Sequence, residues 1–194
     1  MNVPTPQQPS LARELLARAA RAAESWAKRE KDQLDGVRLW TGRHDDYASG
    51  SILRRVIAEH GWPGHRLVGP DAAHAAWRLA LHADDLPDLQ AVAARLMRRA
   101  ADGGDASLRD WAHLHDRALL GCRGHQDFGT QYWLGPTGPQ PCPVHEPDGL
   151  DARRADVGLP PAADALAAVR ARLASIPTSD MTTTITPTVL AVAA

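Results

Sequence analysis

The chain has 194 residues, of which 44% are hydrophobic and 23% charged, an ordinary balance for a globular protein of one domain. Its 22 basic and 23 acidic residues leave a net charge of -1, so it lacks the basic footprint of proteins that bind nucleic acids or anionic lipids. No apolar run approaches the roughly 20 residues of a membrane-spanning helix, and the N-terminal residues lack a secretion signal. We therefore expect a cytoplasmic protein with no nucleic-acid partner and no membrane partner.

The first predicted elements are two amphipathic helices. Residues 1–9 are rich in proline and glutamine and are expected to be disordered. Ser10 can cap a helix over 11–35, where apolar residues recur every three or four positions. A second helix is predicted over 46–60, and it must end before Pro63 because the residue before a proline avoids the helical conformation.

Three further helices are expected in the middle of the chain. Proline is tolerated at the first position of a helix, and Pro70 accordingly begins a predicted helix over 70–83. A fourth helix is predicted over 85–101 and stops at two successive glycines. A fifth is predicted over 107–120, where a serine and an aspartate three residues later resemble a capping box.

The C-terminal part of the chain is less regular. The segment 123–135 is too rich in glycine for a helix and is expected to form a short hairpin or an ordered loop. Residues 136–149 contain five prolines and are expected to be irregular coil. A last helix is predicted over 161–175, and the Thr-rich tail 177–194 is expected to be flexible or to add one strand.

Together these elements predict a mainly α fold. Five or six helices with one weak strand region are typical of an irregular helical bundle. We expect a single helical domain over 10–176, with the short hairpin or ordered loop near 124–135. The two cysteines, Cys122 and Cys142, lack CxxC spacing and are expected to be free thiols in a reducing compartment.

The densest polar cluster at expected core depth is the sequence WAHLHDR, on the helix predicted over 107–120. His113 lies three residues before Asp116 and four before Arg117, so its imidazole can contact either side chain. A carboxylate beside an imidazole raises the pKa of the imidazole and fixes its tautomer, as in many general bases. The alternative is a buried ion pair that holds the following loop in place.

That following loop carries Gln126, Thr130 and Gln131. A glutamine side chain offers two donors and an acceptor, so the loop can bind a polar ligand or can satisfy its own backbone. Trp62 and Trp133 are expected in loops beside these polar motifs, where they can wall a pocket.

Nine histidines raise the question of a metal site. The chain has no HExxH motif, P-loop, GxGxxG fingerprint or GxSxG elbow, so neither nucleotide-cofactor chemistry nor a serine nucleophile is expected. No cofactor is predicted. A divalent metal held by His60, His82 and Asp116 from separate segments stays open as an alternative.

Several stretches taken together resemble the bacterial family catalogued as domain of unknown function 6624. That family shows an H-G-W-P turn, an H-A-D helix end, an L-x-D-R helix and a G-x-Q-x-Y-G-T-Q loop. The corresponding stretches here are HGWPGHRLVG (60–69), AAWRLALHADDLPDLQ (75–90), LHDRALLGCRGHQDFGTQ (114–131) and RRADVGL (153–159). The resemblance covers roughly residues 46–160. It implies a small bacterial protein and carries no known activity.

Departures from the family pattern affect the choice of a catalytic base. Leu81 stands where the family usually has glutamine, and Phe128 stands where it usually has tyrosine. His113 and His115 fall where the family pattern ordinarily has an aromatic and a small polar residue. The resemblance therefore favours His60 and His82 over His113 as the base.

The leading hypothesis is a small cofactor-independent enzyme of specialised metabolism, a hydrolase, lyase or cyclase that acts on a small molecule or short peptide by acid/base chemistry. His60 or His82 is expected to be the acid or base, oriented by Asp116, while Arg117 clamps an anionic group of the substrate. The predicted substrate-binding residues are Trp62, Gln126, Thr130, Gln131 and Trp133.

This hypothesis requires the turn after the second helix, the end of the third helix and the glutamine-bearing loop to meet in one hollow. The alternative is a non-catalytic ligand-binding or protein-interaction module, in which the same polar groups form a structural network. A homodimer is compatible with both.

Overall fold

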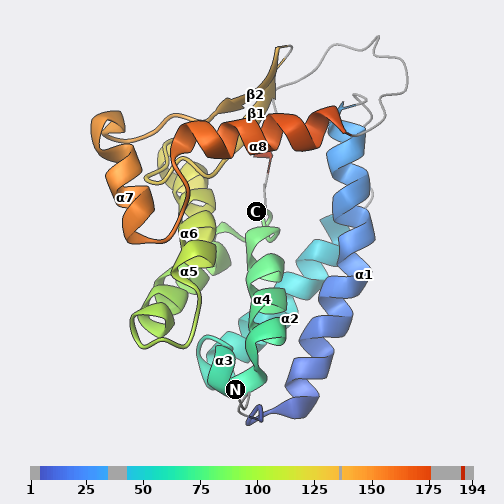
Figure 1. Ribbon diagram of the computed structural model, residues 1–194. Coiled ribbons are helices and arrows are strands. Elements are labelled where there is room, and N and C mark those ends of the chain that lie inside the picture. The colour runs from blue at the N-terminus through green and yellow to red at the C-terminus, as the bar shows by residue number, and fades with distance from the viewer. Residues whose placement is uncertain (1–4, 35–42, 136, 176–188, 191–194) are drawn as a thin grey trace.

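The computed structural model describes residues 5–34, 43–135, 137–175 and 189–190. Within these ranges the chain forms eight α-helices and three short strands, so the predicted mainly α fold is confirmed (Figure 1). The six predicted helices are α1 (Pro9–Leu34), α2 (Arg43–His60), α4 (Pro70–Leu81), α5 (Pro87–Asp102), α6 (Leu108–Arg123) and α8 (Ala162–Ala174).

The helix ends follow the local sequence. Pro70 and Pro87 begin α4 and α5, where the missing backbone N–H of proline costs nothing. The Ser107 hydroxyl accepts a hydrogen bond of 3.1 Å from the backbone N–H of Asp110 and so caps α6. Gly124 ends that helix in the left-handed conformation, with a φ angle of 71°.

Helix α4 is the centre of the main core and contacts α1, α2, α5 and α6. Trp77 and Leu81 of this helix are almost fully buried. Ala76 and Ala80 of the same helix are completely buried, and these small side chains let the neighbouring helices approach closely. We refer to the hydrophobic cluster that surrounds this helix, and that extends to Leu159, as the α4 core.

A small sheet lies beside α8 at the upper end of the molecule in Figure 1, with the strand order β2-β1-β3. The strands are β1 (Tyr132–Gly135), β2 (Gly138–Pro141) and β3 (Val189–Leu190), and β1 pairs antiparallel with both neighbours. Helix α8 crosses over this sheet. Tyr132 and Leu134 of β1 pack against Val169 and Leu173 of α8 in a second hydrophobic cluster, which we call the α8 cluster.

Two short helices and one strand lie where no such element was predicted. Helix α3 (His65–Val68) falls in the predicted loop after α2, and α7 (Leu150–Asp156) falls between the predicted coil and the last helix. The prediction of irregular coil over 136–149 was wrong in part, because this segment contains β2 and a 3₁₀ turn, η1 (Pro147–Gly149).

The terminal segments also bear on the predictions. The backbone N–H groups of Gln7 and Gln8 donate to the carbonyl oxygens of Arg66 and Leu67 at 3.2 and 2.8 Å, so part of the segment expected to be disordered is held against α3. Most of the Thr-rich tail lies outside the described residues, and β3 within it corresponds to the predicted added strand. None of the helices in the described part of the chain is long and apolar enough to cross a membrane.

Candidate functional site

The loop after α6 is organised by the carboxylate of Asp116, which is completely buried. Its two oxygens accept hydrogen bonds of 2.8–3.0 Å from the backbone N–H groups of Asp127, Phe128 and Thr130. The Thr130 hydroxyl adds a fourth at 2.9 Å. Burial raises the pKa of Asp116, and these four donors oppose the rise. Asp116 therefore holds the loop, and it does not orient His60 or His82 as predicted.

The two predicted substrate-binding glutamines are also completely buried. The Gln126 amide donates to the carbonyl oxygens of Gln131 and Cys142, and its own oxygen accepts the backbone N–H of Gln131. The Gln131 amide donates to the carbonyl oxygen of His113 at 3.3 Å and to the Thr130 hydroxyl at 3.1 Å. Both side chains thus join the loop to α6 and to the hairpin, which matches the structural alternative considered for this loop.

Arg117 pairs with an acidic residue that the sequence did not single out. Its guanidinium group donates two hydrogen bonds to the carboxylate of Asp84, at 2.9 and 2.5 Å. Gln90 donates to the same carboxylate at 3.1 Å. Burial acts to raise the pKa of Asp84, but the charge and hydrogen bonds of Arg117 outweigh it and hold that pKa below its usual value. The predicted substrate clamp is therefore engaged with the protein itself.

His82 follows α4 and stacks on Trp26 of α1, with ring centroids 4.1 Å apart. The Trp26 indole N–H donates to Asp46 at 2.9 Å, and the guanidinium group of Arg78 lies 4.6 Å from the Trp26 ring. The charge of His82 also acts on Asp84. Asp84 thus brings Arg117 near His82, and Arg117 donates to the side-chain oxygen of Gln131 at 3.5 Å, so the end of α4 and the glutamine-bearing loop meet here.

His60 and Trp62 lie elsewhere, so the predicted convergence of three regions was wrong in this part. His60 is the last residue of α2, and Trp62 follows it in the turn beside the first turn of α4, whereas His82 follows the last turn of α4. A helix of 12 residues separates the two ends by about 18 Å (Figure 1). Trp62 lines a separate polar cavity of about 290 Å³ together with His74 and Asp110.

Trp133 was predicted to wall a pocket. In strand β1, however, the neighbouring side chains of Trp133 point inward and Trp133 points outward. Successive side chains of a strand point to opposite faces. Tyr132 and Leu134 are 3% and 5% exposed, whereas Trp133 is 37% exposed. The burial alternates along Tyr132–Gly135, but three successive large apolar side chains in the sequence YWLG give no signal that Tyr132 is the inward residue.

A cavity of about 470 Å³ opens on the other side of the loop, between α6 and α8. We call it the α6–α8 cavity. Its volume is within the range of about 300–1,000 Å³ typical of small-molecule sites. Its apolar lining residues are Leu159, Pro160, Ala165, Ala168 and Val169. Its polar lining residues are Arg109, His113, Thr130, Tyr132, Arg154, Asp164 and Arg172.

Two of the polar side chains in this cavity are suited to proton transfer. His113 projects from α6, is 5% exposed, and packs edge-on against Trp77 with ring centroids 6.2 Å apart. Burial raises the pKa of the Tyr132 phenol, which therefore stays protonated at neutral pH. Sequence reasoning ranked His113 below His60 and His82 and did not consider Tyr132.

Arg154 of α7 is the other residue that sequence reasoning missed, although it lies in the stretch RRADVGL. It is only 2% exposed and donates to the carbonyl oxygens of Phe128, Gly129 and Pro160. Burial lowers the pKa of its guanidinium group, which nevertheless stays charged. The identity of the buried arginine depends on tertiary packing, which local sequence does not encode.

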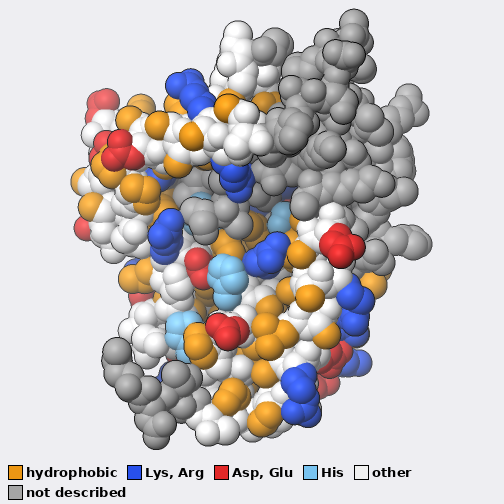
Figure 2. Space-filling model, turned by 45° about the vertical axis from the view of Figure 1, so that its right-hand side comes forward, with side chains coloured by type: hydrophobic (Ala, Val, Ile, Leu, Met, Phe, Trp, Pro, Cys, Tyr) orange, Lys and Arg blue, Asp and Glu red, His pale blue; other side chains and the backbone are white. Residues whose placement is uncertain are grey.

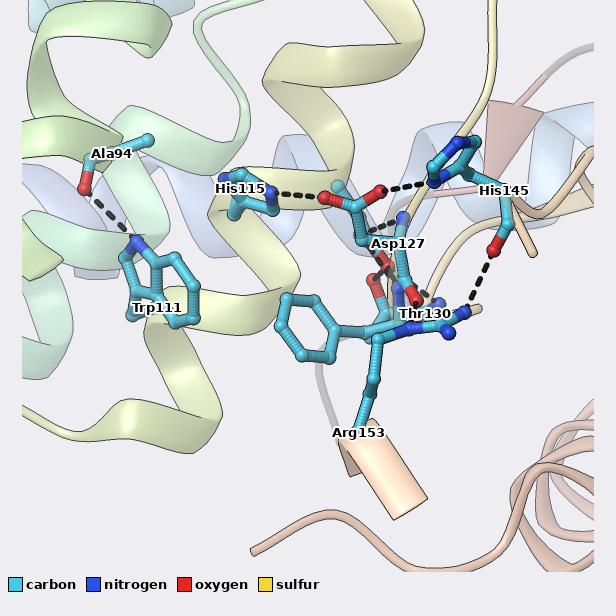
Figure 3. A network of polar contacts seen from close by, with 9 residues as sticks. Ala94, Trp111, His115, Asp127, Thr130, His145 and Arg153 are labelled. Carbon is cyan, nitrogen blue, oxygen red and sulfur yellow. Dashed lines mark hydrogen bonds and ion pairs between the residues drawn. The ribbon is translucent and has the colours of Figure 1, made fainter. Parts of the chain in front are cut away.

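Two further histidines, His115 and His145, contact the carboxylate of Asp127 in the loop after α6 (Figure 3). His115 Nε2 is 2.8 Å from one carboxylate oxygen of Asp127, and His145 Nδ1 is 3.9 Å from the other. Arg153 of α7 donates to the carbonyl oxygens of Asp127 and His145. These partly exposed contacts fasten α7 and the segment before it to the loop.

Figure 2 shows histidine, arginine and acidic side chains gathered across the middle of one face. Among the described residues, no group of three or more His, Cys, Asp or Glu side chains is arranged to hold a metal ion. The trio His60, His82 and Asp116 is accordingly not brought together. Both cysteines are free thiols, and burial raises the pKa of Cys142 to about 12, so that thiol stays protonated.

The protein is thus a mainly helical domain. The loop after α6, held by hydrogen bonds to Asp116, lies between the ion pair of Asp84 with Arg117 and the α6–α8 cavity. The model of the family of unknown function DUF6624 matches residues 39–172. That is more than half of the chain, and the protein belongs to this family. No curated protein and no solved structure matches the chain significantly.

Proposed function

We propose that this protein is a small acid/base enzyme that binds a small molecule in the α6–α8 cavity and uses His113 for proton transfer. The observation that supports this proposal is the convergence of an imidazole, His113, and a protonated phenol, Tyr132, on one mainly apolar cavity of about 470 Å³. A cavity of that size favours a small molecule over a peptide.

The proposed roles follow from the chemistry of the side chains. A neutral imidazole can accept a proton from a substrate and return it later, while the Tyr132 hydroxyl donates a hydrogen bond to an oxygen that gains negative charge. The apolar walls limit the access of water and so strengthen these electrostatic interactions. Such proton transfer serves hydrolases, lyases and cyclases alike.

Asp116, Gln126, Thr130 and Gln131, which we call the buried loop cluster, act as a positioning framework in this proposal. The Gln131 amide holds the carbonyl oxygen of His113, and Thr130, which lines the cavity, donates to Asp116. These bonds fix the α6 turn that carries the imidazole and the loop that faces it. Asp116 and Gln131 are therefore positioning residues and not catalytic residues.

A second candidate function is a non-catalytic ligand-binding module. The observation that favours it is the loop cluster itself, in which Asp116, Gln126 and Gln131 are buried and bonded to the protein. Such a network can serve only to shape a rigid binding cavity. The cytoplasmic location, the bacterial origin and the homodimer stay predictions under either function.

The test measures turnover of a panel of apolar esters, amides and lactones by mass spectrometry, with the full chain and with His113→Gln. We expect the wild-type protein to convert at least one compound and His113→Gln to lose about 10²–10⁴-fold in rate. The control is His145→Gln, a change at an exposed histidine outside the cavity, which should keep its rate. Equal rates in the wild type and His113→Gln would contradict the proposal, and binding without turnover would support the module.

A further inference from the structure

Arg154 carries a buried positive charge on the wall of the α6–α8 cavity. This side chain is 2% exposed, and no carboxylate of a described residue forms an ion pair with it. Its hydrogen bonds go to three backbone carbonyl oxygens, including that of Pro160 at 2.6 Å. Carbonyl dipoles solvate a guanidinium group but leave its charge unneutralised, and a buried charge without a counter-ion is costly.

The carboxylates nearest to Arg154 are already engaged. Asp116 and Asp151 both act electrostatically on Arg154. Asp116 directs both oxygens to the N–H and O–H donors of the loop. Asp151 accepts the backbone N–H of Ala162 at 2.8 Å, at the start of α8. Neither is placed to serve as the direct counter-ion.

The remainder of the α6–α8 cavity has the same sign of charge. Arg109 and Arg172 line it with Arg154, and the single acidic lining residue is Asp164. The other walls are apolar, with Leu159 and Val169 among them. A molecule that complements this cavity has an anionic group at one place and an apolar body elsewhere.

We infer that the substrate of the α6–α8 cavity is a small carboxylic acid with an apolar body, bound with its carboxylate toward Arg154; this inference rests on the function proposed for that cavity. The planar carboxylate matches the geometry of a guanidinium group, which can donate to both of its oxygens. The apolar body lies against α8, and the carboxylate supplies the counter-ion that Arg154 lacks within the described protein.

The first test compares four ligands of one chain length by calorimetric titration of the full chain: octanoate, 1-octanol, octylamine and octyl phosphate. We expect octanoate to bind at least about tenfold more tightly than 1-octanol, a difference of roughly 1.4 kcal/mol, and octylamine to bind most weakly. Octanol binding as tightly as octanoate, octylamine binding more tightly, or octyl phosphate binding more tightly than octanoate would each overturn the inference.

The second test uses a matched pair of variants on α8. Arg172→Gln removes a lining charge, whereas Arg170→Gln removes an exposed charge of the same helix that does not line the cavity. We expect octanoate to bind several-fold more weakly to Arg172→Gln and equally well to Arg170→Gln. Equal affinity for both variants would overturn the inference. Arg154→Gln is a less direct probe, because this residue also holds the loop carbonyls.

The outcomes separate this inference from the proposed function. Binding that is selective for octanoate, with no effect of His113→Gln on turnover, upholds the carboxylate and contradicts the enzyme. Turnover that depends on His113, together with preferred binding of octanol, upholds the enzyme and contradicts the carboxylate. Failure of all the alkyl ligands to bind would overturn the carboxylate inference and leave the enzyme to be judged by turnover. Ala168→Trp, which fills the cavity, is the reference for absent binding.

Discussion

The buried loop cluster and the α6–α8 cavity lie on two sides of Thr130 and treat buried polar groups in opposite ways. In the cluster, the oxygens of Asp116 and the amides of Gln126 and Gln131 are bonded to the protein. In the cavity, Arg154 is equally buried but has no ion-pair partner among the described residues. Satisfied buried groups fix a structure, whereas an uncompensated charge marks a place where a ligand adds what the protein lacks.

We expect the largest loss of stability when the carboxylate of Asp116 is removed from the buried loop cluster. Asp116→Ala leaves three buried backbone N–H groups and the Thr130 hydroxyl without their acceptor. Because each unsatisfied buried donor costs about 1–3 kcal/mol, we expect the free energy of unfolding to fall by at least about 3 kcal/mol. Urea denaturation measures this change.

The control for that variant is Asp102→Ala, which removes a half-exposed carboxylate paired with Arg98 four residues earlier. It should change the free energy of unfolding by no more than about 0.5 kcal/mol. Comparable losses in the two variants would contradict the structural role of Asp116.

The next largest effect is the stabilisation of the folded protein by a ligand that binds in the α6–α8 cavity. Octanoate at 100 times its dissociation constant should raise the free energy of unfolding by about 2.7 kcal/mol, because it binds only the folded state. The same ligand should leave the stability of Ala168→Trp unchanged. Stabilisation of both proteins to the same extent would place the binding outside the cavity.

A smaller effect is expected for one glutamine of the cluster. Gln126→Leu removes an amide that bonds to the backbone of Gln131 and to the carbonyl oxygen of Cys142. We expect a loss of about 2 kcal/mol in urea denaturation. Gln140→Leu is the control, because its amide makes an exposed bond to Thr137. A loss as large in the control would mean that burial is not what makes Gln126 important.

The smallest effect, and the one that depends on pH, belongs to the ion pair between Asp84 and Arg117. Asp84→Asn should cost only about 1 kcal/mol near neutral pH, because the Asp84 side chain is 50% exposed. The folded-state pKa of Asp84 lies below its ordinary value of 3.8, so the pair contributes fully above that value and is lost as the pH falls through the lower one.

The difference in stability between the wild type and Asp84→Asn should therefore shrink in urea denaturation as the pH is lowered below about 4. A difference that grows on acidification would show that the pKa of Asp84 is not lowered in the folded protein.

The helices could be predicted from the sequence because each is encoded locally. The apolar period identifies α4, α5 and α6, and Pro70 and Ser107 mark where two of them begin. Strand β2 could not be predicted, because its prolines argue against a strand. Among the described strands it lies at the edge of the sheet and pairs with β1 alone, and proline is tolerated there.

The site was predicted only in part, for a reason of geometry. The sequence singled out Asp116, Gln126 and Gln131 as a possible site, but polar residues that occur close together do not show by themselves whether they form a framework or a binding surface. The distance between His60 and His82 depends on the direction of α4, which runs between them. The burial of Arg154 depends on how α7 meets the loop, and nothing near it in the sequence specifies that contact.

One wall of the α6–α8 cavity belongs to a different hydrophobic cluster from the rest. Val169 and Tyr132 are part of the α8 cluster, whose four buried members are Tyr132, Leu134, Val169 and Leu173, whereas Leu159 belongs to the α4 core. Separating α8 from the hairpin exposes only the smaller cluster, so this outer helix can swing away while the central helices stay folded. Such a local opening widens the cavity without global unfolding, and backbone amides of α8 should exchange with deuterium sooner than those of α4.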